Sequence, residues 1–193
     1  GQKILILDED LHPFPILDWP VAPVLRHLEP PAEFDPDMPW AVLTGKAYNF
    51  QYGWDSQFLD ERTHPFPAGS GVWIKVLAQS AALETYYRDS EYAPIFGTKD
   101  PNGIASADIW YWDKGMRHNT YAVPQDHYGR FTAAYKIYLG SIATGDELVN
   151  AQGVPLYGSA VLTCHWMRPC PYTIMGDINS DCIVDLYDFS LLA

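Results

Sequence analysis

The sequence predicts an all-β protein, a β-sandwich of jelly-roll-like form, and three observations favour this class. Six or seven strand-like runs lie between Trp40 and Met167. No long amphipathic helical pattern separates them. The 193 residues are 48% hydrophobic, which is typical of a folded chain with a sizeable core. We expect an extended arm over 1–39, a sandwich domain over 40–168 and a tail over 169–193.

The N-terminal arm combines a short apolar run with many prolines. The run KILIL, Lys3–Leu7, lacks alternation, as expected for a short strand buried on both faces. Eight of the sixteen prolines follow, and they favour extended backbone that lacks ladder donors. They are Pro13, Pro15, Pro20, Pro23, Pro30, Pro31, Pro36 and Pro39. Such an arm is long enough to wrap its own domain or to reach a neighbouring molecule.

Three segments of the central domain alternate clearly: GVWIKVLAQ at 71–79, RFTAAYKIYLG at 130–140 and SAVLTCHWM at 159–167. Every second side chain of a strand lies on the same face of its sheet. The residues that share a face within each strand are Val72, Ile74, Val76 and Ala78; Phe131, Ala133, Tyr135, Ile137 and Leu139; and Ala160, Leu162, Cys164 and Trp166.

Shorter strand-like runs lie at about 41–53, 107–112 and 118–123. The residues Asp113-Lys114-Gly115 supply a turn between the second run and the third. The segment ALETYYRDSEY, 82–92, fits either one helical turn or the continuation of a strand.

The tail carries oxygen ligands at the spacing of a calcium loop. Loop positions 1, 3, 5, 7, 9 and 12 are Asp177, Asn179, Asp181, Ile183, Asp185 and Asp188. All would bind through side-chain oxygens except Ile183, which would supply its backbone carbonyl, and Ca²⁺ takes six to eight such oxygens. Four carboxylates within twelve residues repel one another until a dication binds. We therefore expect the order of this loop to depend on Ca²⁺.

Residues 176–193 resemble the dockerin calcium repeat, an EF-hand-like loop with Asp at position 12 and a Leu-rich helix after it. The resemblance implies a Ca²⁺ site made by the six residues just named, followed by a helical turn. Dockerins pair two such repeats and bind a cohesin partner in extracellular assemblies. This chain shows one repeat, with Cys182 at position 6 where Gly is usual. A lone repeat leaves four apolar residues without a partner face: Leu186, Phe189, Leu191 and Leu192.

The three cysteines help to place the tail. Cys164 shares a strand face with Leu162 and Trp166, which indicates a buried thiol. Cys170 and Cys182 remain, and a disulfide between them would tie the calcium loop to the last strand of the domain. Such a bond contributes about 3 kcal/mol and forms in an oxidising compartment. A Cys164–Cys170 bond is the rival pairing, and three cysteines also permit one intermolecular bond.

Composition and motifs argue against several classes of function. The net charge of −12 opposes binding to nucleic acid or to anionic lipid. No apolar run approaches the ~18 residues of a membrane span, so we expect no membrane insertion. Nucleophile-elbow, zinc-protease and phosphate-loop motifs are missing from the sequence. Glu84 and Asp108 are the only acids near strands to test as a glycosidase pair, and we expect no enzymatic activity.

The aromatic stretch IWYWDKGMRHNTY is the best candidate for a surface function. Trp110 and Trp112 share one face of the expected strand, and Ile109 and Tyr111 share the other. A sandwich strand needs only one apolar face. The second face is therefore either exposed, where aromatic rings stack on sugars, or covered by the arm or a neighbouring subunit. We mark Trp110 and Trp112 as candidate carbohydrate or subunit contacts.

Taken together, these features predict a secreted, non-enzymatic structural protein. An apolar N-terminal strand, an extended arm and half of a calcium motif are all satisfied if subunits exchange terminal segments. Head-to-tail contacts of that kind build extracellular filaments or surface layers. The expected partners are copies of the same chain, stabilised at the tail by Ca²⁺. The alternative is a carbohydrate-binding or adhesin-like module of a larger secreted polysaccharide-degrading system, carrying a truncated dockerin.

Overall fold

The computed structural model describes residues 2–5, 24–25, 37–55, 65–89, 91–172, 174–178 and 182–191, with the backbone alone for 2–5, 187 and 189. Across these residues the chain is mostly β-strand, which confirms the predicted all-β class. Two short helical segments accompany the strands, a 3-10 helix η1 (Pro39–Leu43) and the helix α1 (Leu186–Ser190).

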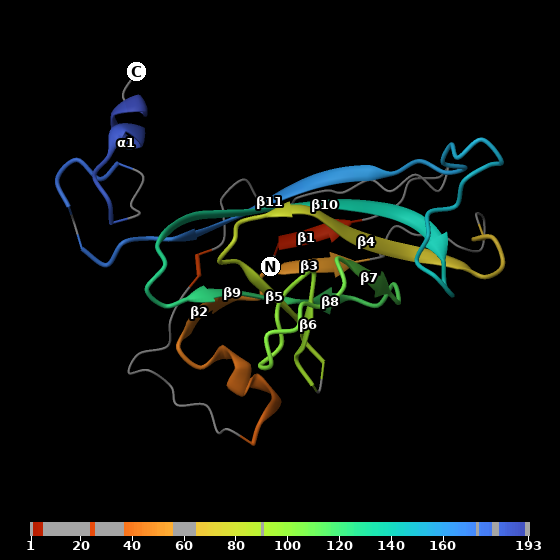
Figure 1. Cartoon of the computed structure of the whole chain (residues 1–193), viewed down its shortest axis with the longest axis horizontal. Helices are drawn as coiled ribbons and strands as arrows, with labels where there is room; N and C mark the ends of the chain where they lie inside the picture. Colours follow the sequence, from red (N-terminus) through yellow and green to blue (C-terminus); the bar gives the residue numbers. More distant parts are fainter. Residues whose placement is uncertain are drawn as a thin grey trace.

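The described strands form three sheets (Figure 1). The first is antiparallel, in the order β11 (Ala160–Arg168), β10 (Gly129–Ser141), β4 (Ser70–Gln79) and β7 (Ile109–Trp112). The second is also antiparallel, in the order β2 (Lys46–Asn49), β9 (Thr120–Pro124), β5 (Glu84–Tyr87) and β6 (Ala93–Ile95). In the third, β3 (Tyr52–Asp55) pairs with β8 (Arg117–His118) and with β1 (Gln2–Leu5). The β1–β3 pair is parallel and so departs from the antiparallel order of a jelly roll.

The alternation predicted for β10 and β11 matches their burial. The residues expected to share a face are buried from Phe131 to Leu139 in β10, and from Leu162 to Trp166 in β11. In β4 the pattern ends early, since Val72 and Ile74 are buried while Ala78 is exposed. The pairing of β4 with β10 shifts register at a bulge, and Ala78 lies beyond it.

Two other segments were less clear from the sequence. The single strand predicted at about 41–53 is wrong, because the segment forms η1, β2 and the start of β3. Gly45, with a φ of +71°, separates η1 from β2, and the Asn49 side chain accepts the N–H of Gln51 over 2.6 Å at the turn into β3. The segment 82–92, whose sequence fits either a helical turn or a strand, contains the strand β5.

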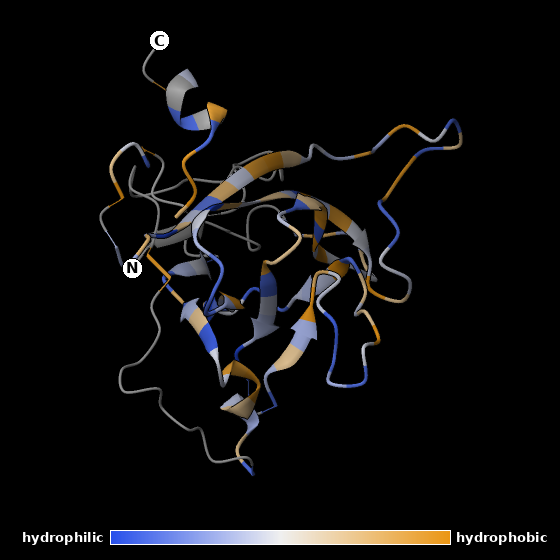
Figure 2. Ribbon diagram, turned by 60° about the vertical axis from the view of Figure 1, so that its left-hand side comes forward, coloured by the Kyte–Doolittle hydropathy of each residue, from blue (hydrophilic) through white to orange (hydrophobic). Residues whose placement is uncertain are grey.

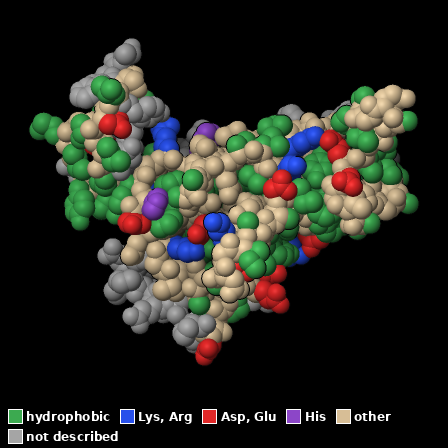
Figure 3. Space-filling view, viewed as in Figure 1, with side chains coloured by type: hydrophobic (Ala, Val, Ile, Leu, Met, Phe, Trp, Pro, Cys, Tyr) green, Lys and Arg blue, Asp and Glu red, His purple; other side chains and the backbone are tan. Residues whose placement is uncertain are grey.

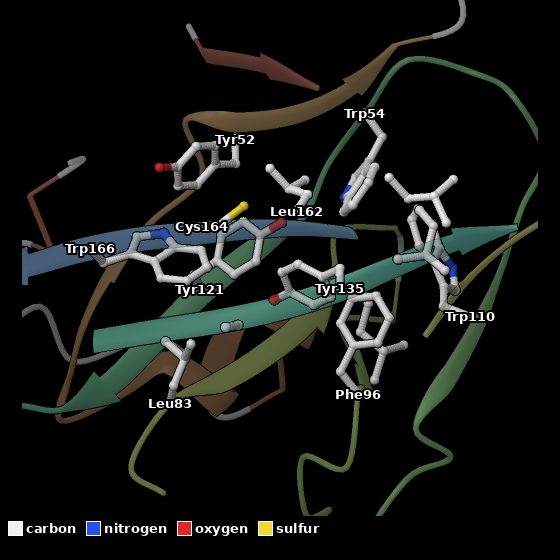
Figure 4. Packing of buried hydrophobic residues seen from close by; sticks show 14 of the residues in the cluster. Tyr52, Trp54, Leu83, Phe96, Trp110, Tyr121, Tyr135, Leu162, Cys164 and Trp166 are labelled. Carbon is white, nitrogen blue, oxygen red and sulfur yellow. The ribbon is translucent and has the colours of Figure 1, made fainter. Parts of the chain in front are cut away.

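One aromatic core joins all three sheets (Figure 4). Tyr52 of β3 meets Trp166 of β11 edge to face, with ring centroids 5.2 Å apart. Trp54 of β3 meets Tyr135 of β10 in the same manner at 5.8 Å. Such pairs contribute about 0.5–1.5 kcal/mol each beyond the burial of their area. The first sheet therefore packs against the other two across a shared interior.

Parts of the N-terminal arm lie on the body of the same chain. The strand β1 pairs with β3 over residues 2–5, while the rest of the predicted run Lys3–Leu7 lies outside the described residues. Leu25 donates its N–H to the carbonyl of Met167 over 2.8 Å, and its side chain is fully buried in the core. The arm thus adds a strand and a core residue to its own domain. The other residues of 1–36 are outside the described part of the chain.

Candidate functional site

The C-terminal tail stands apart from the sheets and carries α1 near its end (Figure 1). A disulfide joins Cys170 to Cys182, with Cα atoms 5.3 Å apart, which confirms the predicted pairing. Cys164 is instead a buried free thiol on β11, and burial raises the pKa of that thiol. The rival Cys164–Cys170 bond is therefore not formed. Disulfides of this kind persist in oxidising environments.

Cys182 occupies the loop position that usually needs glycine, and its backbone adopts the conformation that glycine favours. Its φ is +69°, in the left-handed region that costs an L-residue about 1–2 kcal/mol. Its N–H donates to Oδ2 of Asp177 over 2.9 Å, which joins loop position 1 to position 6. The chain therefore makes the sharp turn of the loop with cysteine in place of glycine.

Asp188, at loop position 12, ties the two ends of the loop together. Its carboxylate is fully buried. Oδ1 accepts the N–H of Ile178 over 2.7 Å, and Oδ2 accepts the N–H of Asp185 over 2.9 Å. Hydrogen bonds to a charged group contribute about 1.5–3 kcal/mol, so this one side chain organises the backbone of both halves of the tail.

The remaining predicted calcium ligands are only partly visible. Asn179 and Asp181 lie outside the described residues, whereas Asp177, Ile183, Asp185 and Asp188 lie within them. Among the described residues no three acidic, histidine or cysteine side chains are grouped closely enough to hold a metal ion. In the same part of the chain, no helix is long and apolar enough to cross a membrane.

The tail exposes a set of apolar side chains, which we name the tail patch (Figure 3). Its members are Tyr172, Met175, Ile178, Ile183, Val184, Leu186 and Leu191. Met175 is 97% exposed and Leu186 is 85% exposed. Because the tail stands off the sheets, these side chains face solvent in this chain.

A second exposed apolar set lies on the connection between β10 and β11, and we name it the hairpin patch. Its members are Ile142, Val149, Val154 and Leu156. Backbone hydrogen bonds hold this connection, from Asn150 to Val154 over 2.8 Å and from Leu156 to Leu148 over 2.8 Å. The hairpin patch and the tail patch lie at opposite ends of the long axis of the molecule (Figures 1 and 2).

The structure corrects the role expected of Trp110 and Trp112. Trp110 is 9% exposed and packs its ring on Phe96 and Trp54, while Trp112 is fully buried and donates its Nε1–H to the carbonyl of Gly115. Neither ring is free to stack on a sugar or a subunit. Their strand pairs with β4 so that Trp110 lies opposite Ile74 and Trp112 opposite Val72, both core positions.

The opposite face of β7 carries the exposed aromatic surface instead. Tyr111 of β7 is 37% exposed and lies opposite Trp73 of β4, with ring centroids 5.3 Å apart. Trp73, which is part-buried, in turn lies opposite Tyr138 of β10, which is buried and donates its hydroxyl to the carbonyl of Gly145 over 2.8 Å. Three aromatic side chains, which we name the aromatic row, thus cross three neighbouring strands in register. The alternation within 71–79, 109–112 and 130–140 separates each of these rings from the other face of its own strand, but only strand register brings the three together.

A groove of about 410 Å³ runs beside the aromatic row. Lys75, Asp108, Lys136 and Glu147 line it, together with Tyr138 of the row. Lys75 pairs with Asp108 at 3.4 Å, and Lys136 pairs with Glu147 at 2.6 Å. The other acid considered for catalysis, Glu84, lies on a different sheet and pairs with Lys46. The structure thus does not bring Glu84 and Asp108 into one sheet.

Comparison with known protein families, with curated protein sequences and with solved structures found no match to this chain.

Proposed function

We propose that this chain is a secreted, non-enzymatic structural protein that assembles head to tail with copies of itself. The observation that carries the proposal is the presence of two exposed apolar patches, the tail patch and the hairpin patch, at opposite ends of the long axis. A contact between different surfaces of two copies is heterologous, and it repeats into an open filament unless the rotation closes a ring. Burial of both patches supplies the hydrophobic free energy of each contact.

Ca²⁺ orders the joining surface in this proposal. Asp177, Asn179, Asp181, Asp185 and Asp188 would hold the ion with the carbonyl of Ile183, a hard oxygen set of the kind that Ca²⁺ prefers. Support comes from the buried carboxylate of Asp188 and from the turn at Cys182, which together bring loop positions 1, 6 and 12 into one folded unit. The bound ion would supply two positive charges among carboxylates that otherwise repel one another.

Ca²⁺ also acts on assembly through the charge of the whole molecule. Each copy carries a net charge of −12, so copies repel one another at long range. A dication bound in the tail lowers that repulsion at the surface where two copies meet. Assembly is therefore expected to weaken when calcium is removed.

The N-terminal strand has a smaller part in this proposal than the sequence predicts. Because β1 pairs with β3 of the same chain, its backbone donors and acceptors are satisfied without an exchange between subunits. The same pairing is kept if two copies do exchange this segment, so exchange remains part of the proposal as a second contact.

We also propose that the three sheets together form a sandwich related to a jelly roll.

The disulfide supports secretion. Reducing conditions in a cytosol keep such bonds open, whereas extracellular and periplasmic conditions keep them formed. The bond ties position 6 of the proposed calcium loop to Cys170, which follows the end of β11. A secreted structural protein of this kind would work outside the cell.

The test uses two charged substitutions that block one patch each, Leu186→Asp on the tail and Leu156→Asp on the hairpin. Sedimentation velocity is measured in calcium and in excess chelator. The wild-type chain should form long particles in calcium and small ones in chelator, and each variant alone should stay monomeric. A mixture of the two variants should form one-to-one dimers and nothing longer, because one intact patch of each kind remains.

Ile104→Asp is the matched control, since Ile104 is exposed and lies outside both patches. It should assemble as the wild type does. A wild-type chain that is monomeric in calcium overturns the proposal. Filaments that form equally well with both patches charged would overturn the assignment of the joining surfaces.

A further inference from the structure

We propose that the outer face of β4, β7 and β10 binds a neutral polysaccharide, stacking sugar rings on Tyr111 and Trp73 beside the charged groove. This goes beyond assembly, because Tyr111 and Trp73 themselves belong to neither the tail patch nor the hairpin patch. The proposal stands on the form of the aromatic row, on the paired charges next to it and on the size of the groove.

The rings of Tyr111 and Trp73 lie close to the sheet because glycines lie beneath them, and their planes are tilted 58° to each other. A Cβ placed on Gly71 would come within 2.6 Å of the Tyr111 ring, and one on Gly140 would come within 2.9 Å of the Trp73 ring. The rings therefore rest directly on the backbone of the sheet. Tyr111, which is 37% exposed, offers apolar ring surface to the apolar face of a sugar, with the part-buried Trp73 beside it.

The groove offers hydrogen-bonding groups that are already fixed in place. Lys75 and Lys136 are each held by a carboxylate, Asp108 and Glu147 respectively. Hydroxyl groups both donate and accept, so a lysine and a carboxylate side by side can satisfy one sugar hydroxyl each way.

Charge decides the class of ligand. The two lysines that line the groove are matched by Asp108 and Glu147, and Asp146 adds one further negative charge. The whole chain is also strongly acidic. An anionic polymer would therefore be repelled, whereas a neutral polymer experiences no such electrostatic repulsion. The volume of about 410 Å³ falls within the ~300–1,000 Å³ of small-ligand sites and suits a short stretch of sugar units.

The experiment is affinity electrophoresis of the full chain through gels that contain mixed-linkage β-glucan, xyloglucan, galactomannan or polygalacturonate. Each gel is run with the wild type and with Leu186→Asp, so that self-assembly does not cause retardation. At least one neutral polymer should slow both chains, and anionic polygalacturonate should slow neither. Tyr111→Ala should weaken binding at least tenfold, while Tyr111→Phe, which keeps the ring, should bind nearly as well.

Trp40→Ala is the matched control, because Trp40 is an exposed aromatic residue outside the aromatic row. It lies on η1, which precedes β2 of the second sheet. It should bind as the wild type does. Near-ultraviolet circular dichroism of each variant shows whether it folds. Tyr111→Thr, which also lacks a ring and suits a strand, repeats the test if Tyr111→Ala does not fold. The proposal is overturned if no neutral polymer retards the chain, or if retardation is the same in Tyr111→Ala and in the wild type.

Discussion

Cys182 donates its backbone N–H to Oδ2 of Asp177 over 2.9 Å, from a left-handed backbone with φ of +69°. The same residue forms the disulfide with Cys170. A cysteine is a costly choice for such a turn, because its Cβ is strained where glycine is not. The disulfide offsets that strain by closing a loop of twelve residues, which stabilises the folded tail by about 3 kcal/mol.

Two double variants separate the strain from the disulfide. Cys170→Ser/Cys182→Gly and Cys170→Ser/Cys182→Ser both lack the bond, and they differ only at the strained position. The glycine variant should have the more stable tail by about 1 kcal/mol, because glycine adopts positive φ without strain. Hydrogen exchange of the amides in 174–191 measures the local opening free energy. Equal protection in the two variants would mean that the turn stores no strain.

Asp188→Asn should loosen both halves of the tail. An amide side chain has one acceptor oxygen, so either Ile178 or Asp185 loses the partner of its N–H. If Asp188 also binds Ca²⁺, titration calorimetry should show an affinity at least tenfold lower, together with faster exchange at those two amides. Asp126→Asn on the exposed turn before β10 is the control and should change neither quantity. Calcium binding of full strength in Asp188→Asn would remove Asp188 from the ligand set.

Trp110→Ala and Tyr111→Ala are neighbours in sequence and should differ widely in stability. Trp110 fills a core site against Phe96 and Trp54, so its truncation should cost about 3–5 kcal/mol of unfolding free energy. Tyr111 is on the outer face, so its truncation should lower the unfolding free energy by far less. Urea unfolding, monitored by far-ultraviolet circular dichroism of the backbone, gives both values. A larger loss of unfolding free energy in Tyr111→Ala than in Trp110→Ala would mean that Tyr111, and not Trp110, faces the core.

The stability of the fold should fall in strong alkali. Burial, with the neighbouring Cys164 second, raises the pKa of Tyr52 to about 12, and burial together with Glu147 raises the pKa of Tyr138 to about 12. An unfolded tyrosine loses its proton near its ordinary pKa of 10.0, so between pH 10 and about 12 the unfolded state binds fewer protons than the folded state. The free energy of unfolding therefore decreases as the pH rises through this window, and it is unaffected by these groups below pH 10.

Tyr52→Phe tests this account, because it removes one of the two groups and keeps the ring. Its unfolding free energy should decline less steeply than that of the wild type between pH 10 and 12. Urea unfolding at a series of pH values measures the slope, and ultraviolet absorbance of tyrosinate follows ionisation directly. An identical slope in the variant would assign the alkaline effect to other residues.

Local patterns in the sequence were enough for several features of this protein. The alternation in 130–140 and 159–167 identifies the buried face of β10 and β11, because a strand repeats every two residues whatever it pairs with. The same pattern identifies Cys164 as a buried thiol, which left Cys170 and Cys182 as the favoured pair. The order of oxygen ligands from Asp177 to Asp188 also predicts a calcium loop, since loop ligands follow one another along the chain, and this stays a prediction.

Only the tertiary structure decided which face of 109–112 lies inside. Alternation separates Trp110 and Trp112 from Tyr111, but both faces are apolar, and the register with β4 chooses between them. The parallel pairing of β1 with β3, the aromatic row and the placement of the two patches at opposite ends also depend on how distant chain segments pack together. The sequence by itself determined what repeats within a strand or a loop. Pairing between strands depends on which distant surfaces bury the most apolar area together, and a local pattern does not contain that information.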